Sequence, residues 1–272
     1  MKRRARNIAL KVAYDGTRYH GFQRQMPPIL AVQNVLEQAL GSVFGDSVEL
    51  AAAGRTDAGV HAAGQVVNFF TDGRIPLSRV LRAVNSLLPE DIVVKEVWEA
   101  DRAFSARHSA KSKTYLYRIQ QGETPSPFTA RFAWYERRPL DLEAMRGAMR
   151  LLLGTHDFSS FRAAGGAPMS PVRTMLESDV YEIDGGQLEF RLHGTGFLYH
   201  MVRNIVGTVH DVGLGRRSVQ DFAAILAAKD RQQASPTAPA CGLCLYEVAY
   251  EGCCSCAVKP RVESGKEKRP GR

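Results

Sequence analysis

Hydrophobic and polar residues follow two different spacings along the chain. In "NIALKVAY" the apolar residues Ile8, Leu10 and Val12 alternate with other residues, which predicts a strand with a buried face. From Val32 to Val43 the apolar residues recur every three or four positions, which predicts an amphipathic helix. The chain therefore opens with a strand followed by a helix.

Strands and helices continue to alternate through the rest of the chain. The next predictions are a strand in "GQVVNFF", a helix that opens at Pro76 and turns Leu87 and Leu88 inward, and a strand in "DIVVKEVW". A second round of elements starts near Lys113 with "TYLYRIQ". It continues with a helix at 141–153, strands in "VRTMLESDVYEI" and "QLEFRLHG", helices at 197–212 and 218–228, and a final strand in "LCLYEVAY".

The order of elements predicts an α+β protein with helices on one side of a sheet. The two rounds resemble each other in order and meet near residues 104 to 112, which predicts an N-terminal half at 1–104 and a C-terminal half at 105–251. The segment "VKPRVESGKEKRPGR" is charged and poor in apolar residues. We therefore predict that 252–272 form a basic, cysteine-containing tail that is disordered from Val258 onward.

Composition and charge narrow the class of partner. The chain has 272 residues, 44% of them hydrophobic, which is enough for a sizeable core. Its formal charge of +8 and pI near 9.4 favour a polyanionic partner such as nucleic acid. Apolar runs are too short for a membrane span, and "MKRRARNIALKV" lacks the features of a secretory signal. The expected location is the cytoplasm.

The cysteines leave two interpretations open. All five lie near the C-terminus, and the pairs Cys241/Cys244 and Cys253/Cys256 both have C-x-x-C spacing, which is compatible with zinc. The alternative places Cys244 on the final strand and the later cysteines, Cys254 included, in the tail. We favour the second interpretation because the loop between the pairs is short.

Cofactor motifs are missing or incomplete. "GTGFLYHMVRN" begins G-x-G, but Tyr199 stands where a dinucleotide fingerprint has its third glycine, and the chain contains no phosphate-binding G-x-x-x-x-G-K-[ST] loop. The histidines show no metal-binding spacing, so we interpret them as core, surface or RNA-contacting residues: His61, His108, His156, His193, His200 and His210. We expect no cofactor and no metal.

One carboxylate stands out, Asp57 in "GRTDAGVH". An aspartate in a glycine-containing turn commonly accepts hydrogen bonds from nearby backbone amides, which is a purely structural role. Arg55 and Thr56 before it, and Gly59 after it, instead favour a loop that presents the carboxylate to a cleft. Apolar strands on both sides would anchor such a loop.

The segment "GRTDAGVHAAGQVVNF" resembles the signature of the TruA family of tRNA pseudouridine synthases. The resemblance extends over nearly the whole chain, through "YDGTRYHGFQRQ", "VQNVLEQAL", "FSARHSAKSKTYLY", "GTHDFSSFR", "GTGFLYHMVRNIVG" and "APACGL". Phe22 stands where family members commonly carry tryptophan, which keeps an aromatic ring but removes an indole donor. Residues beyond 251 lie outside the resemblance.

The resemblance implies a tRNA pseudouridine(38-40) synthase, an isomerase acting on uridines of the anticodon stem-loop. Uracil is detached from the ribose, turned, and rejoined through carbon. The implied partners are tRNA and a second copy of the chain, in a homodimer whose subunits both contact one tRNA. The implied architecture is the pseudouridine synthase fold: antiparallel sheets of two similar halves join into one extended mixed sheet, with an RNA-binding cleft between the halves.

The resemblance also assigns roles to residues of the site. Asp57 is the expected nucleophile, because carboxylates do comparable work at glycosidic carbons in retaining glycosidases. Arg203 in "HMVRN" is expected to pair with that carboxylate and favour its charged form, the alternative being a phosphate contact. Tyr115 is expected to offer an aromatic face to the extruded uracil, and Arg55 to contact the RNA. Tyr117, on the same face of the strand, is the expected core residue.

Basic residues in or beside the shared segments are predicted to contact RNA phosphates: Arg24, Arg107, Lys113 and Arg162. For any one of these, a solvated charge is the alternative. Two other functions stay open. A noncatalytic RNA-binding or RNA-chaperone protein on the same scaffold would not need Asp57. A small-molecule enzyme using "GTGFLYH" as an anion loop would bind nucleotides or sugar phosphates without RNA.

Overall fold

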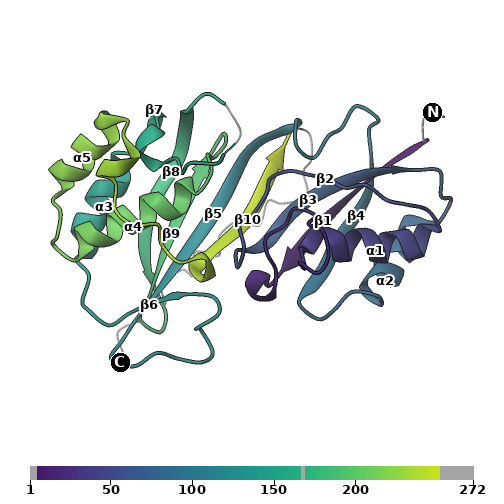
Figure 1. The fold of residues 1–272 in the computed structure, drawn as a ribbon, viewed down its shortest axis with the longest axis horizontal. Helices are drawn as coiled ribbons and strands as arrows, with labels where there is room; N and C mark the ends of the chain where they lie inside the picture. The colour runs from purple at the N-terminus through teal and green to yellow at the C-terminus, as the bar shows by residue number, and fades with distance from the viewer. Residues whose placement is uncertain (1–4, 167–168, 252–272) are drawn as a thin grey trace, which may run out of the picture.

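The computed structural model describes residues 5–166 and 169–251, and one mixed sheet runs through them (Figure 1). Its strands follow the order β4-β1-β3-β10-β5-β9-β8-β7, with β2 paired to β3 and β6 paired to β5. The strands are β1 (Arg6–Tyr14), β2 (Ala51–Ala52), β3 (His61–Thr71), β4 (Ile92–Ala100), β5 (Ala110–Gln121), β6 (Trp134–Glu136), β7 (Gly154–Asp157), β8 (Val172–Ile183), β9 (Gln187–Gly194) and β10 (Leu243–Tyr250).

Helices form a layer on one face of this sheet (Figure 1). They are α1 (Val32–Phe44), α2 (Leu77–Asn85), α3 (Leu142–Arg150), α4 (Met201–Gly213) and α5 (Val219–Ala228). Helix α2 packs beside α1, and α3 and α5 pack beside α4. Short 3-10 helices lie at Gly16–Arg18, Ser159–Phe161, Arg231–Gln233 and Ala240–Gly242. The predicted α+β class with helices on one side is confirmed.

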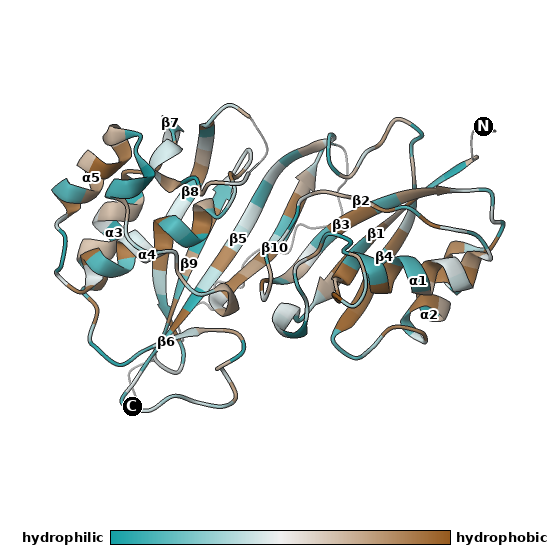
Figure 2. Ribbon diagram, viewed as in Figure 1, coloured by the Kyte–Doolittle hydropathy of each residue, from teal (hydrophilic) through white to brown (hydrophobic). Residues whose placement is uncertain are grey.

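The first part of the sheet consists of β4, β1 and β3. Strand β1 pairs antiparallel with β3 on one edge and with β4 on the other. Its residues Ile8, Ala9 and Leu10 are completely buried. Figure 2 shows hydrophobic residues gathered along these strands and on the inner sides of α1 and α2. The periodicity at 32–43 is confirmed by α1, whose Val32, Leu36 and Leu40 are buried.

The last strand of the chain joins the two parts of the sheet. Strand β10 pairs parallel with β3, with His61 opposite Cys244, and antiparallel with β5, with Tyr115 opposite Leu245. Residues at the start of β3 and in the middle of β5 therefore lie one strand apart, although the chain separates them widely. The boundary predicted near residue 104 stays a prediction.

Two details of the helix predictions are wrong. Leu87 was expected to face inward, but α2 ends at Asn85 and the Leu87 side chain beyond it is 53% exposed. The helix expected from Phe197 begins only at Met201, because His200 has φ of 57°, a left-handed conformation that interrupts a right-handed helix. Within the described residues, every helix is too short or too polar to cross a bilayer.

Candidate active site

Asp57 lies in a tight turn between β2 and β3. The Val60 amide donates to the Asp57 carbonyl at 3.1 Å, and Gly59 takes the left-handed φ of 76° that the turn requires. The preceding Thr56 is buried, and its hydroxyl lies 2.8 Å from the Tyr14 hydroxyl. The backbone is thus held in place while the Asp57 side chain keeps 23% of its surface exposed.

The segment "YDGTRYHGF" supports this turn from behind. The Phe22 amide donates to the Thr56 carbonyl at 3.1 Å. A Cβ on Gly21 would stand 2.7 Å from the same carbonyl oxygen, so only glycine fits there. Phe22 itself is 1% exposed and packs near the Tyr14 ring, which makes it a core residue behind the turn.

Arg203 reaches Asp57 from the other half of the chain. Its NH1 donates to Asp57 Oδ2 at 3.1 Å, and its Nε donates to the Ala238 carbonyl at 2.8 Å. The second bond fixes the plane of the guanidinium, because both donors belong to one rigid group. Helix α4 carries Arg203 in its first turn. The ion pair expected from the sequence is therefore present in the structure.

His200 is a member of the site that the sequence analysis did not single out. Its Nε2 lies 3.3 Å from Asp57 Oδ2, and the residue occupies the N-cap position of α4. Burial lowers the pKa of His200, with further lowering by Arg203 and Arg231 and an opposing contribution from Asp57. The imidazole is therefore neutral at pH 7. The available signal was its place three residues before Arg203 within the helix predicted at 197–212, since residues three apart share a helix face.

Tyr115 lies on β5 beside this cluster. The side chain is 8% exposed, and the Phe197 ring meets it edge-on with 4.9 Å between centroids. Burial raises the pKa of Tyr115, and the charge of Asp57 raises it further, so the hydroxyl stays protonated. Tyr117 is fully buried and donates its hydroxyl hydrogen to the Pro239 carbonyl at 2.8 Å. The prediction that Tyr117 is core is confirmed.

The predicted RNA-contacting residues have different surroundings. Arg55 is exposed next to Asp57, and Arg107 is exposed before β5. Arg162 donates to the Met169 carbonyl at 3.3 Å. Lys113 is half-buried and donates to the Ala53 carbonyl at 2.7 Å. Arg24 instead pairs with Glu37 at 2.9 Å, so part of its charge is compensated within the protein.

Metal-binding side chains do not gather in the described part of the chain. Within residues 5–166 and 169–251, no three or more His, Cys, Asp or Glu side chains are placed to share a metal ion. Cys241 Sγ lies 3.7 Å from the Ala133 carbonyl, and burial raises the pKa of Cys244 to about 11. The second pair, Cys253 and Cys256, lies outside the described residues together with the rest of the predicted tail. The expectation that the chain binds no metal thus stays a prediction.

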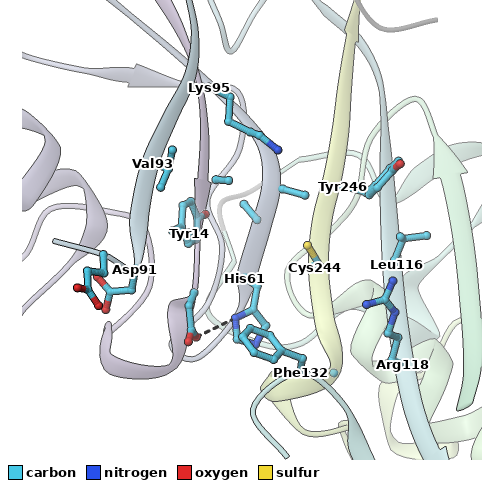
Figure 3. A pocket seen from close by; sticks show the side chains of 16 residues that line it. Tyr14, His61, Asp91, Val93, Lys95, Leu116, Arg118, Phe132, Cys244 and Tyr246 are labelled. Atoms are coloured by element: carbon cyan, nitrogen blue, oxygen red, sulfur yellow. Dashed lines mark ion pairs between the residues drawn. The ribbon is translucent and has the colours of Figure 1, made fainter. Parts of the chain in front are cut away.

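A cleft of about 410 Å³ lies where β1, β3, β10 and β5 run side by side (Figure 3). Leu116 and Cys244 line it, whereas Tyr115 and its neighbour Leu245 point to the other face, because successive residues of a strand alternate. Phe132 and His61 close one end of the cleft. This cleft is therefore separate from the candidate active site.

Comparison with known proteins identifies the chain's relatives. A tRNA pseudouridine synthase family model matches residues 10–108 and 148–251. The tRNA pseudouridine synthase A of Latilactobacillus sakei is 46% identical over 242 residues, covering 88% of this chain and 97% of that protein. The tRNA pseudouridine synthase A of Geobacillus kaustophilus is 48% identical over 244 residues, covering 89% of this chain and 94% of that protein.

These matches place the chain among the RNA-modifying isomerases. It belongs to the tRNA pseudouridine synthase family, and both parts of the sheet fall within the matched residues. A solved Cbf5-Nop10-Gar1 complex also matches, with a TM-score of 0.35 and 14% identity over 73% of this chain and 44% of that chain. That overlap is too small to bear on the site, and the family assignment rests on the sequence matches.

Proposed function

We propose that this protein isomerises uridine to pseudouridine in the anticodon stem-loop of tRNA, with Asp57 as the nucleophile. The observation that carries the proposal is the contact of 3.1 Å between Asp57 Oδ2 and Arg203 NH1, made next to Tyr115. A carboxylate held in one orientation by a fixed guanidinium suits attack on a nucleoside, and no redox or metal chemistry is needed for the reaction.

Arg203 has two roles in this proposal. It places a positive charge directly opposite the Asp57 carboxylate. It also leaves one oxygen of Asp57 less engaged, because NH1 contacts Oδ2. The less engaged Oδ1 is then the atom that faces the extruded nucleotide.

Tyr115 and Arg55 bind the substrate in this proposal. The target base must leave its stack before the glycosidic bond can be reached, and a buried aromatic ring gives the base a surface to lie against. Tyr115 is held by the edge of Phe197, so its orientation is set before RNA arrives. Arg55 is exposed beside Asp57 and contacts the RNA around the extruded nucleotide.

The surplus of positive charge supports tRNA as the partner. With a formal charge of +8, the protein attracts the phosphate backbone, and Arg107, Lys113 and Arg162 contribute to that attraction. Arg24 contributes less, because Glu37 compensates it. The family membership favours an enzyme over a noncatalytic RNA-binding protein or a small-molecule enzyme.

We also propose that the protein acts in the cytoplasm as a homodimer, with one tRNA contacting both subunits. Within each chain, the N-terminal and C-terminal halves meet near residue 104. The support for the dimer is the resemblance to the tRNA pseudouridine synthase family. Sedimentation equilibrium tests this part. A single species at the monomer mass would remove it.

The decisive experiment uses an unmodified tRNA transcript carrying uridine with tritium at carbon five. Isomerisation releases this tritium to water, because carbon five becomes the attachment point to ribose. The wild-type protein is compared with Asp57→Asn, which keeps the shape of the side chain and removes its charge. Asp184→Asn, at an exposed carboxylate in the hairpin between β8 and β9, is the matched control.

We expect wild type and Asp184→Asn to release tritium equally, and Asp57→Asn to release none above background. Absence of release by the wild type would overturn the enzymatic proposal. Full release by Asp57→Asn would leave the activity intact but remove Asp57 as the nucleophile.

A further inference from the structure

Lys113 occupies an unusual position for a lysine. Its Nζ donates to the Ala53 carbonyl, four residues before Asp57, at 2.7 Å. Burial, together with the smaller effect of the positive charges of Arg107 and Arg173, lowers the pKa of Lys113 to about 8. Holding an ammonium group there is unfavourable unless a negative charge arrives.

The groups that face Lys113 are cationic or neutral. Arg107 faces it from the segment before β5, Arg173 from β8, and the loop before Asp57 contributes the Ala53 carbonyl. Among the ion pairs of the described residues, none joins Lys113, Arg107 or Arg173 to a carboxylate. Arg173 donates only to the carbonyls of Ser170 and Val172 and to the Met169 sulfur.

Glycine backbones line the approach to these cations. A Cβ on Gly54 would stand 2.9 Å from Lys113 Nζ, and a Cβ on Gly196 would stand 3.3 Å from Arg173 Nε. Because no side chain stands at either position, the Lys113 and Arg173 side chains lie directly against the backbone of Gly54 and Gly196.

The cluster adjoins the candidate active site. Lys113 and Tyr115 are two residues apart on β5, whose pairing with β9 is regular, so their side chains lie on the same face. Their Cα atoms are about 6 to 7 Å apart at the usual rise of a strand. An RNA strand whose base lies against Tyr115 therefore has its own sugar-phosphate backbone within reach of Lys113.

We propose that Lys113, Arg107 and Arg173 form a subsite for one phosphate group of the bound RNA, next to the nucleotide that Tyr115 receives. The phosphate supplies the negative charge that the cluster lacks. That the RNA is tRNA rests on the proposed function. The subsite differs from the general attraction of the basic surface, because here a single phosphate contacts three cationic side chains. Arg107 closes the subsite from the solvent side.

A consequence distinguishes this subsite from ordinary surface contacts. A bound phosphate raises the pKa of Lys113, since an opposite charge favours the ammonium form. Below about pH 8 the lysine is charged in the free protein, so RNA binding requires no proton. Above that pH the free lysine is neutral, so binding takes up a proton and weakens as the pH rises.

The test measures the affinity for unmodified tRNA as a function of pH and salt. The wild type is compared with Lys113→Met, and with Lys111→Met as a control for the loss of one positive charge on the same strand, where Lys111 pairs with Glu251 at 2.9 Å. We expect constant wild-type affinity below about pH 7.5 and weakening that approaches tenfold per pH unit above about pH 8.5.

Lys113→Met should bind tRNA about tenfold more weakly than the wild type at pH 7 and should lose most of the pH dependence of binding. It should also lower the slope of log K against log salt by about one. Calorimetry of the wild type in buffers of different ionisation enthalpy measures the proton uptake directly. That measurement decides the proposal even if Lys113→Met does not fold.

Wild-type affinity that stays constant to pH 9, or an equal loss in Lys111→Met and Lys113→Met, would overturn the phosphate subsite. Tritium release by the wild type, with no proton uptake on tRNA binding at pH 9, overturns the subsite alone. Proton uptake on tRNA binding without tritium release overturns the enzymatic proposal alone.

Discussion

Arg203 NH1 lies 3.1 Å from Asp57 Oδ2, although 146 positions separate these residues along the chain. The first residue belongs to α4 and the second to the turn before β3, so the contact joins the two parts of the sheet. Because Arg203 Nε is held by the Ala238 carbonyl, the guanidinium cannot follow a carboxylate that moves. The pair therefore fixes the direction in which the Asp57 carboxylate points.

The first prediction concerns the geometry of this pair. Arg203→Lys keeps the positive charge but loses the planar donor group that contacts Ala238 and Asp57 together. We expect single-turnover pseudouridine formation to slow on the order of 100-fold, while the affinity for tRNA changes little. Arg216→Lys, at an exposed pair with Asp211, is the control. Equal rates for the two variants would mean that Arg203 supplies charge alone.

The second prediction separates the ring of Tyr115 from its hydroxyl. Tyr115→Ala removes the stacking surface, which is worth roughly 1 to 3 kcal/mol per base, and we expect a 5- to 150-fold loss of kcat/KM. Tyr115→Phe keeps the ring against Phe197 and should lose less unless the hydroxyl exchanges a proton. Tyr246→Ala, on the opposite face of the sheet, serves as the control. Turnover by Tyr115→Ala at the wild-type rate would remove Tyr115 from the mechanism.

The third prediction uses the neutral state of His200. Its pKa is lowered by burial, so the imidazole gains a proton only when the pH falls below its ordinary range. The protonated ring then donates to Asp57 Oδ2 and adds a second positive partner to the carboxylate. We expect activity to fall on the acid side of the pH–rate profile and this fall to move to lower pH in His200→Asn. Asparagine tolerates the left-handed backbone at this position. If the pH–rate profiles of the wild type and His200→Asn fall at the same pH on the acid side, the prediction is contradicted.

The fourth prediction is that tRNA binding depends strongly on salt. With phosphate contacts providing most of the attraction, the affinity should fall at least tenfold between about 50 and 200 mM salt. Arg55→Ala should lower the slope of log K against log salt by about one and weaken binding to all tRNAs alike. Arg216→Ala, compensated by Asp211, should leave the slope unchanged. An affinity that does not respond to salt would contradict tRNA binding by the basic surface.

The fifth prediction concerns stability. Glu136 accepts hydrogen bonds from Arg138 and from buried His210, and the Arg138 contact is the main cause that lowers the pKa of Glu136 to about 2. A carboxylate whose pKa is lower in the folded state stabilises the fold above its ordinary pKa of about 4.5 and loses this contribution as the pH falls toward 2. Glu136→Gln should lower the free energy of unfolding at pH 7 by roughly 1.5 to 3 kcal/mol.

Urea unfolding at pH 7, 5 and 3 tests this prediction. The difference between wild type and Glu136→Gln should shrink as the pH falls, whereas exposed Glu182→Gln should match the wild type throughout. A difference that grows toward low pH would show that Glu136 is not the acid-sensitive group.

Local patterns in the sequence determined the elements of this fold. The spacing of apolar residues at 32–43 and the alternation in "NIALKVAY" predicted α1 and β1, because a helix and a strand each bury one set of regularly spaced positions. The helix predicted at 218–228 agrees with α5 to within one residue, and the Ser218 and Asp221 side chains form a capping box at its start. Boundaries were less certain, as the late start of α4 shows.

Asp57, Arg203 and Tyr115 could be named from their motifs, but spacing along the chain contained no information about their proximity. The tertiary structure alone decided that proximity, because the last strand, β10, inserts between β3 and β5 and brings their site-bearing segments together. The same packing places His200 next to the Asp57 carboxylate. It also places Lys113 near Arg107 and Arg173, with no carboxylate paired to the lysine among the described residues. The charge and proton affinity of a side chain depend on its burial and on its long-range partners. A residue's neighbours in sequence determine neither its burial nor those partners.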